Sequence, residues 1–158
     1  MKKISIAILV VAVVIGFSLR ASAQFIPTVK EVTGFGGMTF NGKDEATAGA
    51  ALAINVSPRI GIEGEASMIF GDDNIVNGSV NIMLNLGSGT TPIVPYFIGG
   101  AGVLNNGGTD IALNAGFGLK LFVESNLALR ADFRGFFTSE GGDIHDMERA
   151  YGGFTVFF

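Results

Sequence analysis

The sequence predicts an all-β fold, an eight-stranded antiparallel up-and-down transmembrane β-barrel. The first observation is alternation over residues 111–137, where apolar side chains occupy every second position on both sides of a polar turn at 124–126. The second is strand length, because each arm has the roughly 9–11 residues that a tilted strand needs to cross a bilayer. The third is that no segment after residue 23 has the 3.6-residue period and capping residues of a helix.

The first 23 residues have the pattern of a secretory signal peptide. Lys2 and Lys3 precede an apolar run over residues 4–19, and Ala21-Ser22-Ala23 has the small residues of a cleavage site. The apolar run is short for a membrane helix, which needs about 20 residues. We therefore expect a cleaved signal peptide at 1–23 and a single barrel domain at 24–158.

Eight alternating segments follow one another along the mature chain. We expect strands at 32–40, 47–56, 59–70, 78–86, 93–104, 111–123, 127–137 and 149–158. Asn41-Gly42 has the residues of a tight β-turn after the first strand, and Ser57-Pro58 makes a second tight turn. The alternation assigns each strand an apolar and a more polar face, except in the fifth strand, where it does not decide. In a membrane barrel the apolar face meets lipid and the other face lines the lumen.

The acidic residues concentrate in segments that we expect to be loops at the end of the barrel away from both termini. They are Asp44, Glu45, Asp72, Asp73, Asp110, Glu140, Asp143, Asp146 and Glu148. The longest expected loop is 139–148, which holds His145, the single histidine. Outward-facing Phe40, Phe70 and Phe137 fall at these loop ends and Phe158 falls at the opposite rim, as in a partial aromatic girdle.

Charged residues on the inward faces predict a salt-bridge cluster within the lumen. The expected members are Glu63, Glu65, Lys120, Arg130, Asp132 and Arg134. The third and seventh strands lie across from each other in an eight-stranded cylinder, and buried charges are costly unless they are paired. We expect Glu63 and Glu65 to meet the three basic residues, with Asp132 shared between its neighbours. Such a cluster fills the lumen as a polar core, or else it gates a narrow ion path.

Composition limits the classes of function. Without Lys2, Lys3 and Arg20, seven of the ten basic residues remain against 14 acidic ones. This excess of negative charge gives no support to nucleic-acid binding, which needs a basic surface. The chain has no cysteine and therefore no disulfide. Asp72-Asp73-Asn74 lacks the ligand spacing of an EF-hand, and no motif predicts a cofactor or a metal site.

Three stretches carry a resemblance to a known family: PYFIGGAGV at 95–103, NAGFGLKLFVESNLALRADFRGFF at 114–137 and YGGFTVFF at 151–158. The chain resembles the small eight-stranded outer-membrane β-barrel family of Gram-negative bacteria, the OmpA-like and OmpX-like group that includes many "porin family" chains. The resemblance implies a place in the outer membrane among lipid and lipopolysaccharide, as a monomer. It also implies an assembly signal for the barrel-assembly machinery at Tyr151, Phe154, Val156 and Phe158.

The leading functional hypothesis is an integral outer-membrane protein with a structural or surface-interaction role and no enzymatic activity. The alternative is a small, porin-like pore. A less favoured possibility is a membrane-embedded lipid-modifying enzyme, which would need His145 together with Ser139, Asp143 or Asp146. A soluble lipocalin-like barrel would need apolar residues inside and polar residues outside, and the alternation of charges here argues against it.

Overall fold

The computed structural model describes residues 29–158 except 41, 73, 88–90 and 141–142, and leaves out the side chains of 139, 140 and 143–145. The predicted signal peptide therefore lies outside the described residues. The eight strands are β1 (Lys30–Phe40), β2 (Asp44–Asn55), β3 (Ile60–Phe70), β4 (Ile75–Asn85), β5 (Ile93–Asn105), β6 (Thr109–Glu124), β7 (Leu127–Glu140) and β8 (Asp143–Phe157). Within this part of the chain no helix forms, and thus none is long and apolar enough to cross a membrane.

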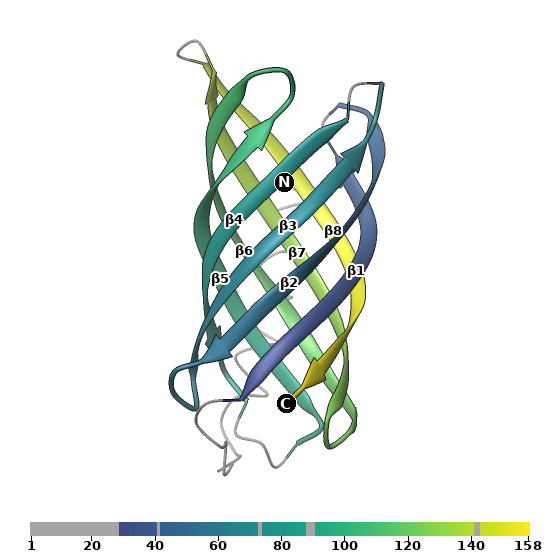
Figure 1. Ribbon diagram of the computed structural model, residues 1–158, viewed down its shortest axis with the longest axis vertical. Helices are drawn as coiled ribbons and strands as arrows, with labels where there is room; N and C mark the ends of the chain where they lie inside the picture. Colours follow the sequence, from purple (N-terminus) through teal and green to yellow (C-terminus); the bar gives the residue numbers. More distant parts are fainter. Residues whose placement is uncertain (1–28, 41, 73, 88–90, 141–142) are drawn as a thin grey trace, which may run out of the picture.

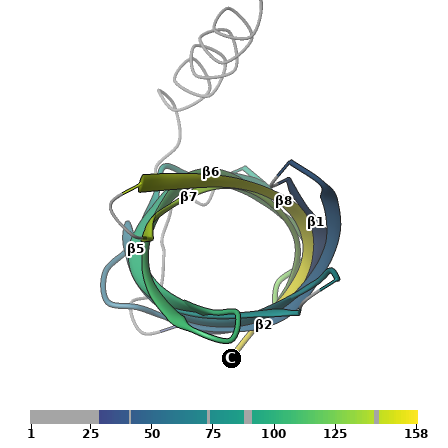
Figure 2. The same cartoon turned by 90° about the horizontal axis from the view of Figure 1, so that it is seen from above.

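The strands form one closed antiparallel barrel in sequence order, which confirms the predicted fold class. Figure 1 shows the tilted strands from the side, and Figure 2 shows the closed ring from above. β1 closes against β8 in a register that pairs Glu31 with Phe157 and Phe40 with Glu148. At the end of this seam the backbone groups of Lys30 and Phe158 exchange two hydrogen bonds of 3.0 Å. Every strand therefore has two hydrogen-bonded neighbours and no edge is left unpaired.

The turns at the end near the termini follow local chemistry. In the turn after β2, Ser57 Oγ accepts hydrogen bonds from the backbone N–H groups of Arg59 (3.3 Å) and Ile60 (3.0 Å). The connection from β6 to β7 is tight, as predicted, and a register shift lies between Phe122 and Glu124. At the other end Gly42 and Gly107 have φ angles of 71° and 74°, which other residues rarely adopt.

The predicted loop 139–148 is wrong. β7 continues to Glu140 and β8 begins at Asp143, with Thr138 paired with His145 across the ladder. The same correction applies to Asp44 and Glu45, which lie in β2, and to Asp110, which lies in β6, whereas Asp72 lies between β3 and β4 as predicted. The sequence of these strand ends is mostly polar, as is typical of a loop. A barrel can extend its strands beyond the apolar zone, where both faces meet water.

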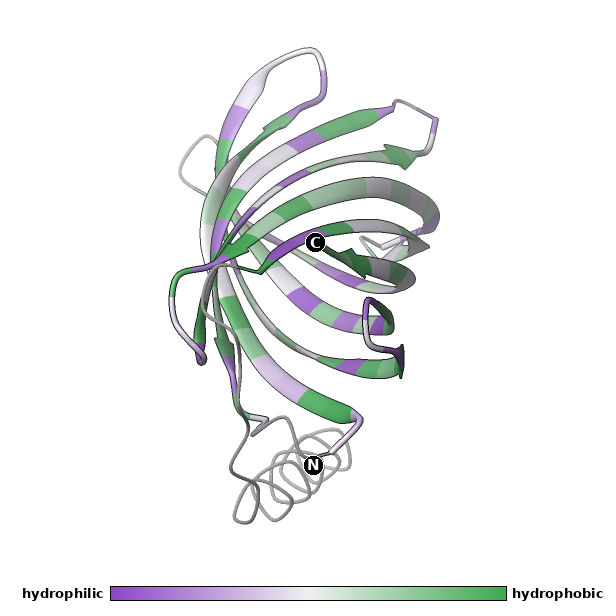
Figure 3. Ribbon diagram, turned by 60° about the horizontal axis from the view of Figure 1, so that its bottom comes forward, coloured by the Kyte–Doolittle hydropathy of each residue, from purple (hydrophilic) through white to green (hydrophobic). Residues whose placement is uncertain are grey.

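The two faces of the barrel wall differ in the way that the alternation predicted, and Figure 3 shows hydrophilic and hydrophobic residues alternating along the strands. Large apolar side chains point outward, among them Leu52, Val80, Ile82, Ile111 and Leu113, each at least 59% exposed. In β5, whose facing the sequence left open, Val94, Tyr96 and Ile98 are buried, whereas Ile93 and Phe97 are exposed. The structure thus has its polar core in the lumen and its apolar surface outside.

Candidate functional site: the lumenal charge network

Eight charged side chains are buried in the lumen, four acidic and four basic. They comprise the six predicted residues, Glu63, Glu65, Lys120, Arg130, Asp132 and Arg134, together with Glu31 and Arg149, which the sequence analysis missed. We call this set the lumenal charge network. Strand geometry places its members, because residues two apart in a strand point to the same side, as Glu63 and Glu65 do in β3 and Arg130, Asp132 and Arg134 do in β7.

Asp132 is the centre of the network. Its Oδ2 atom accepts hydrogen bonds of 2.6 Å from the hydroxyl groups of both Tyr96 and Tyr151. The same atom accepts bonds from Arg130 Nη2 (2.8 Å) and Arg134 Nη2 (3.1 Å). Asp132 is therefore shared between its two neighbours on β7 and is also tied to β5 and β8.

The two arginines of β7 reach across the lumen to β3. Arg130 Nη1 lies 2.5 Å from Glu63 Oε2, and Arg134 Nη2 lies 3.1 Å from Glu63 Oε1. Arg134 also pairs with Glu65, at 2.9 Å between Nη1 and Oε2. These bridges join strands on opposite sides of the barrel, so the network spans the bore.

Lys120 does not join Glu63 and Glu65, contrary to the predicted pairing. Its ammonium group lies 2.6 Å from Glu31 Oε2 and 2.8 Å from Glu31 Oε1. Asn55 Nδ2 donates a further bond of 2.7 Å to Glu31, and the ring of Tyr96 lies 5.4 Å from the ammonium nitrogen. The sequence analysis began the first strand at 32, so it overlooked Glu31 as an inward-facing partner.

Glu65 receives its second basic partner from Arg149, at 2.7 Å from Arg149 Nη2 to Oε1. The aromatic rings of Tyr151 and Phe136 each lie 4.9 Å from this guanidinium carbon. Arg149 was predicted only as the first residue of the last strand. Its position two residues before Tyr151 on the inward face was the available signal.

Amide side chains surround the charges and satisfy part of their remaining hydrogen-bonding capacity. Asn81 donates to Glu63 at 3.3 Å and accepts a bond of 2.9 Å from Asn114. Asn77 donates to Glu65 at 3.2 Å. Buried ions are stable only when pairing and hydrogen bonding replace water, and this second layer of amides supplies that replacement.

The network is electrically neutral and each of its eight members has an oppositely charged partner. Arginine presents donors in a rigid fork, which suits bridging between several carboxylates. The arrangement therefore links β1, β3, β6, β7 and β8 across the lumen. Within the described residues no group of three or more histidine, cysteine, aspartate or glutamate side chains is arranged to hold a metal ion.

The residues of the predicted assembly signal do not all face the same way. Phe154, Val156 and Phe158 are exposed on the outer surface, at 62%, 44% and 66%. Tyr151 points inward and belongs to the surroundings of Asp132. For the suggested enzyme, the backbone of His145 lies in β8 rather than in a loop, and the side chains of Ser139, Asp143 and His145 lie outside the described residues.

No known protein-family model matches the sequence, and no curated protein matches it either. Solved structures do match. The N-terminal β-barrel domain of Pseudomonas aeruginosa OprF has a TM-score of 0.71 and 16% identity, covering 84% of this chain and 98% of that one. Neisserial surface protein A has a TM-score of 0.62 and 11% identity, covering 82% and 96%.

This chain has the fold of the small eight-stranded outer-membrane β-barrels. A further structure with this outer-membrane-barrel fold is that of the outer membrane enzyme PagL, with a TM-score of 0.54 and 14% identity, covering 80% of this chain and 98% of PagL. Identities this low establish the fold alone. Because one structure of the same fold is an enzyme, the fold does not decide between structural and catalytic roles.

Proposed function

We propose that this chain is an integral outer-membrane β-barrel protein with a structural or surface-interaction role, whose lumen is filled by the charge network. The observation that carries the proposal is the inverted distribution of polarity. Large apolar side chains cover the outer wall, and the ion-paired residues lie inside. Such a wall is stable in lipid, where a closed barrel leaves no backbone group unpaired.

The proposed location is the outer membrane, reached through export by a cleaved signal peptide at 1–23. Partners at this location are membrane lipid and lipopolysaccharide, and the proposed state is a monomer. Support comes from the fold shared with Neisserial surface protein A and OprF. Fractionation of cells that express the chain tests the location: we expect the protein in the outer membrane, starting at residue 24 by N-terminal sequencing. Recovery in the inner membrane or the soluble periplasm would contradict the proposal.

The filled lumen supports a role other than conduction. The bridges from Arg130 and Arg134 to Glu63 cross the bore, and these charged side chains are completely buried. We expect the purified protein to insert into a planar bilayer without stepwise conductance. Regular conductance steps would favour the alternative, a small porin-like pore. If such steps disappear after the protein is digested with a protease, a contaminating pore is excluded as their source.

A lipid-modifying activity is the remaining alternative, because PagL is an outer membrane enzyme. Such chemistry would require His145 as a base beside a nucleophile or a carboxylate. We expect cells with the wild-type protein, the His145→Ala variant and no protein to have identical lipid A profiles by mass spectrometry. A change that depends on His145 would overturn the non-enzymatic assignment.

Insertion by the barrel-assembly machinery is proposed to depend on the outward residues of the last strand. Phe154 and Val156 near the end of β8 and Phe158 just after it form an exposed apolar row on the outer surface. We expect Phe158→Ala to lower the amount of barrel in the outer membrane of cells, without an effect on refolding of purified protein in detergent. Equal losses in both assays would indicate a stability effect instead.

A further inference from the structure

An apolar layer closes the lumen at the end away from the termini. It consists of Ile69, Leu104, Ala112, Phe136 and Met147, with Ile75 packed against it. These residues come from β3, β4, β5, β6, β7 and β8, and Phe136 pairs directly with Met147 across the β7–β8 ladder. We call this set the apolar layer. On β2 the buried Thr47 pairs with Ile69 of the layer.

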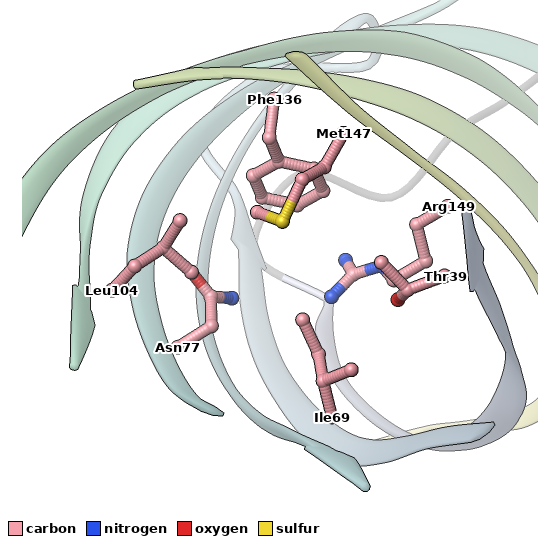
Figure 4. A pocket seen from close by; sticks show the side chains of 7 residues that line it. All are labelled: Thr39, Ile69, Asn77, Leu104, Phe136, Met147 and Arg149. Carbon is pink, nitrogen blue, oxygen red and sulfur yellow. The ribbon is translucent and has the colours of Figure 1, made fainter. Parts of the chain in front are cut away.

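A void lies beneath the layer, between it and the lumenal charge network. It is too narrow to hold a water molecule. Figure 4 shows Ile69, Leu104, Phe136 and Met147 around this space. Thr39, Asn77 and Arg149 line it as well.

Three buried polar atoms at this void have no hydrogen-bond partner: Thr39 Oγ1, Asn77 Oδ1 and Arg149 Nε. Asn77 and Arg149 use their other polar atoms in hydrogen bonds to Glu65 of the network and to the neighbouring Ser67. A hydroxyl, an amide oxygen and a guanidinium N–H that share one void are a complementary set of donors and acceptors for water. Leaving them dry costs free energy, because buried polar groups normally keep a partner.

We propose that the apolar layer is a gate, which opens to admit water from the acidic end to a hydration site formed by Thr39, Asn77 and Arg149. Apolar constrictions close a lumen by excluding water. In the closed state the layer packs well and the three polar atoms are unsatisfied. In the open state the layer loses contacts, and water satisfies those atoms. The free-energy cost of unsatisfied polar atoms in the closed state opposes the cost of lost apolar contacts in the open state. Because these costs offset each other, both states are accessible.

The proposed gate leads to a vestibule and not to a channel. Below the hydration site the bridges between Arg134, Arg149 and Glu65 still cross the lumen. Opening the layer therefore exposes the Arg149 side of the network to solvent while the bore stays closed. The gate goes beyond the proposed structural role. Measurements of solvent access test the gate, whereas the conductance measurement tests the structural role, so a failure of one is distinct from a failure of the other.

Thiol labelling tests the gate, because the chain contains no cysteine. Thr39→Cys places a thiol at the void and sacrifices no hydrogen bond, since Thr39 Oγ1 has none. The probe is a small, membrane-impermeant methanethiosulfonate, and the extent of reaction is followed by mass spectrometry. Lys43→Cys at the exposed rim gives the rate of an open site.

The folded Thr39→Cys protein should react at least about 10-fold more slowly than Lys43→Cys, yet to completion, because local openings reach buried groups. Adding Met147→Ala, which trims the layer, should raise the Thr39→Cys rate at least about 10-fold. Adding Leu113→Ala, a truncation of similar size on the lipid side, should leave the rate within about 2-fold, since Leu113 is exposed on the outer wall. If Met147→Ala does not fold, Leu104→Ala across the layer serves as the trimming variant.

Three outcomes would overturn the gate. Labelling of Thr39→Cys as fast as that of Lys43→Cys would mean that the layer does not close. No reaction in the wild-type background would mean a permanent plug. A rate that Met147→Ala and Leu104→Ala leave unchanged would mean that the layer does not control access. Conductance is expected to stay absent in Met147→Ala, and its appearance would show that the layer, rather than the charge network, is the barrier to ions.

Discussion

Asp132 accepts more lumenal side-chain hydrogen bonds than any other carboxylate of the network. One oxygen accepts from two tyrosines and two arginines. All the arginine contacts are buried, and the loss of one partner of a buried pair leaves the other charges uncompensated. The stability of the barrel should therefore depend more on this carboxylate than on any exposed acidic residue.

Replacing Asp132 with asparagine should cost about 3–5 kcal/mol in the free energy of unfolding, because Arg130 and Arg134 lose a shared anion in a buried site. Urea unfolding in lipid vesicles, followed by tyrosine fluorescence and gel mobility, measures the loss. The matched control is Asp72→Asn, which breaks the exposed ion pair with Lys43 and should cost about 1 kcal/mol or less. Equal losses in the two variants would contradict a buried network.

Glu31 and Lys120 form a pair whose two members can be removed separately or together. Lys120→Met alone should cost about 3–5 kcal/mol, since Glu31 then keeps its charge without a counter-ion. The double variant Glu31→Gln with Lys120→Met should be more stable than Lys120→Met, because no unpaired charge remains. The same unfolding assay provides a double-mutant cycle. Additive losses would show that the two side chains do not interact.

The sequence predicted which faces carry the charges but not all of the partners. Period 2 along β3 and β7 is enough to turn Glu63, Glu65 and Arg130 inward. Pairing depends on the stagger between strands, which a single sequence does not contain. Glu31 lies near the start of β1, outside the predicted first strand, and pairs with Lys120. Arg149 lies in the middle of β8, but it was the first residue of the predicted last strand, where the alternation began.

At the scale of the strands, glycines on the inner face make room for the large side chains of the network. A Cβ atom on Gly118 of β6 would lie 2.3 Å from Tyr96 Oη and 2.6 Å from the Ala131 carbonyl oxygen. Tyr96 donates to Asp132 from this position. Gly64 of β3 faces outward, and a Cβ atom there meets nothing within 4 Å.

Gly118→Ala should destabilise the barrel by about 1–3 kcal/mol, because overpacking displaces Tyr96 from Asp132. Gly64→Ala should stay within about 1 kcal/mol of wild type, since the added methyl group has space in an allowed backbone conformation. Thermal unfolding of both variants in detergent compares them directly. If Gly64→Ala loses as much as Gly118→Ala, the inward and outward assignments of these strands are wrong.

The strands of the last hairpin were predicted too short because the sequence at their outer ends is mostly polar. Glu140 and Asp143 are paired in the ladder although the sequence around them resembles a loop.

The facing of the fifth strand was ambiguous for another reason. Tyr96 faces inward among apolar neighbours, and the small residues Gly99, Gly100 and Ala101 that follow give no contrast between faces. The pairing of β7 with β8 resolves the first case, and the register of β5 with β4 and β6 resolves the second; only the folded barrel supplies either.

At the scale of the whole molecule, the closure of the sheet explains why the polarity can be inverted. All strands are paired on both sides, including β1 with β8. The outer wall therefore needs no polar partner, and the lumen can hold a neutral set of ions and amides. An open sheet of the same sequence would leave unpaired backbone groups in lipid.

Heat modifiability is the most direct test of a closed barrel that faces lipid with its apolar wall. Samples of the membrane-extracted protein are run in detergent gels with and without boiling, after carbonate washing of the membranes. We expect the unboiled protein to migrate as a compact species, to shift on boiling and to resist carbonate extraction. A single mobility under both conditions, with the protein released into the soluble periplasm, would contradict the account and would place the charged faces in water.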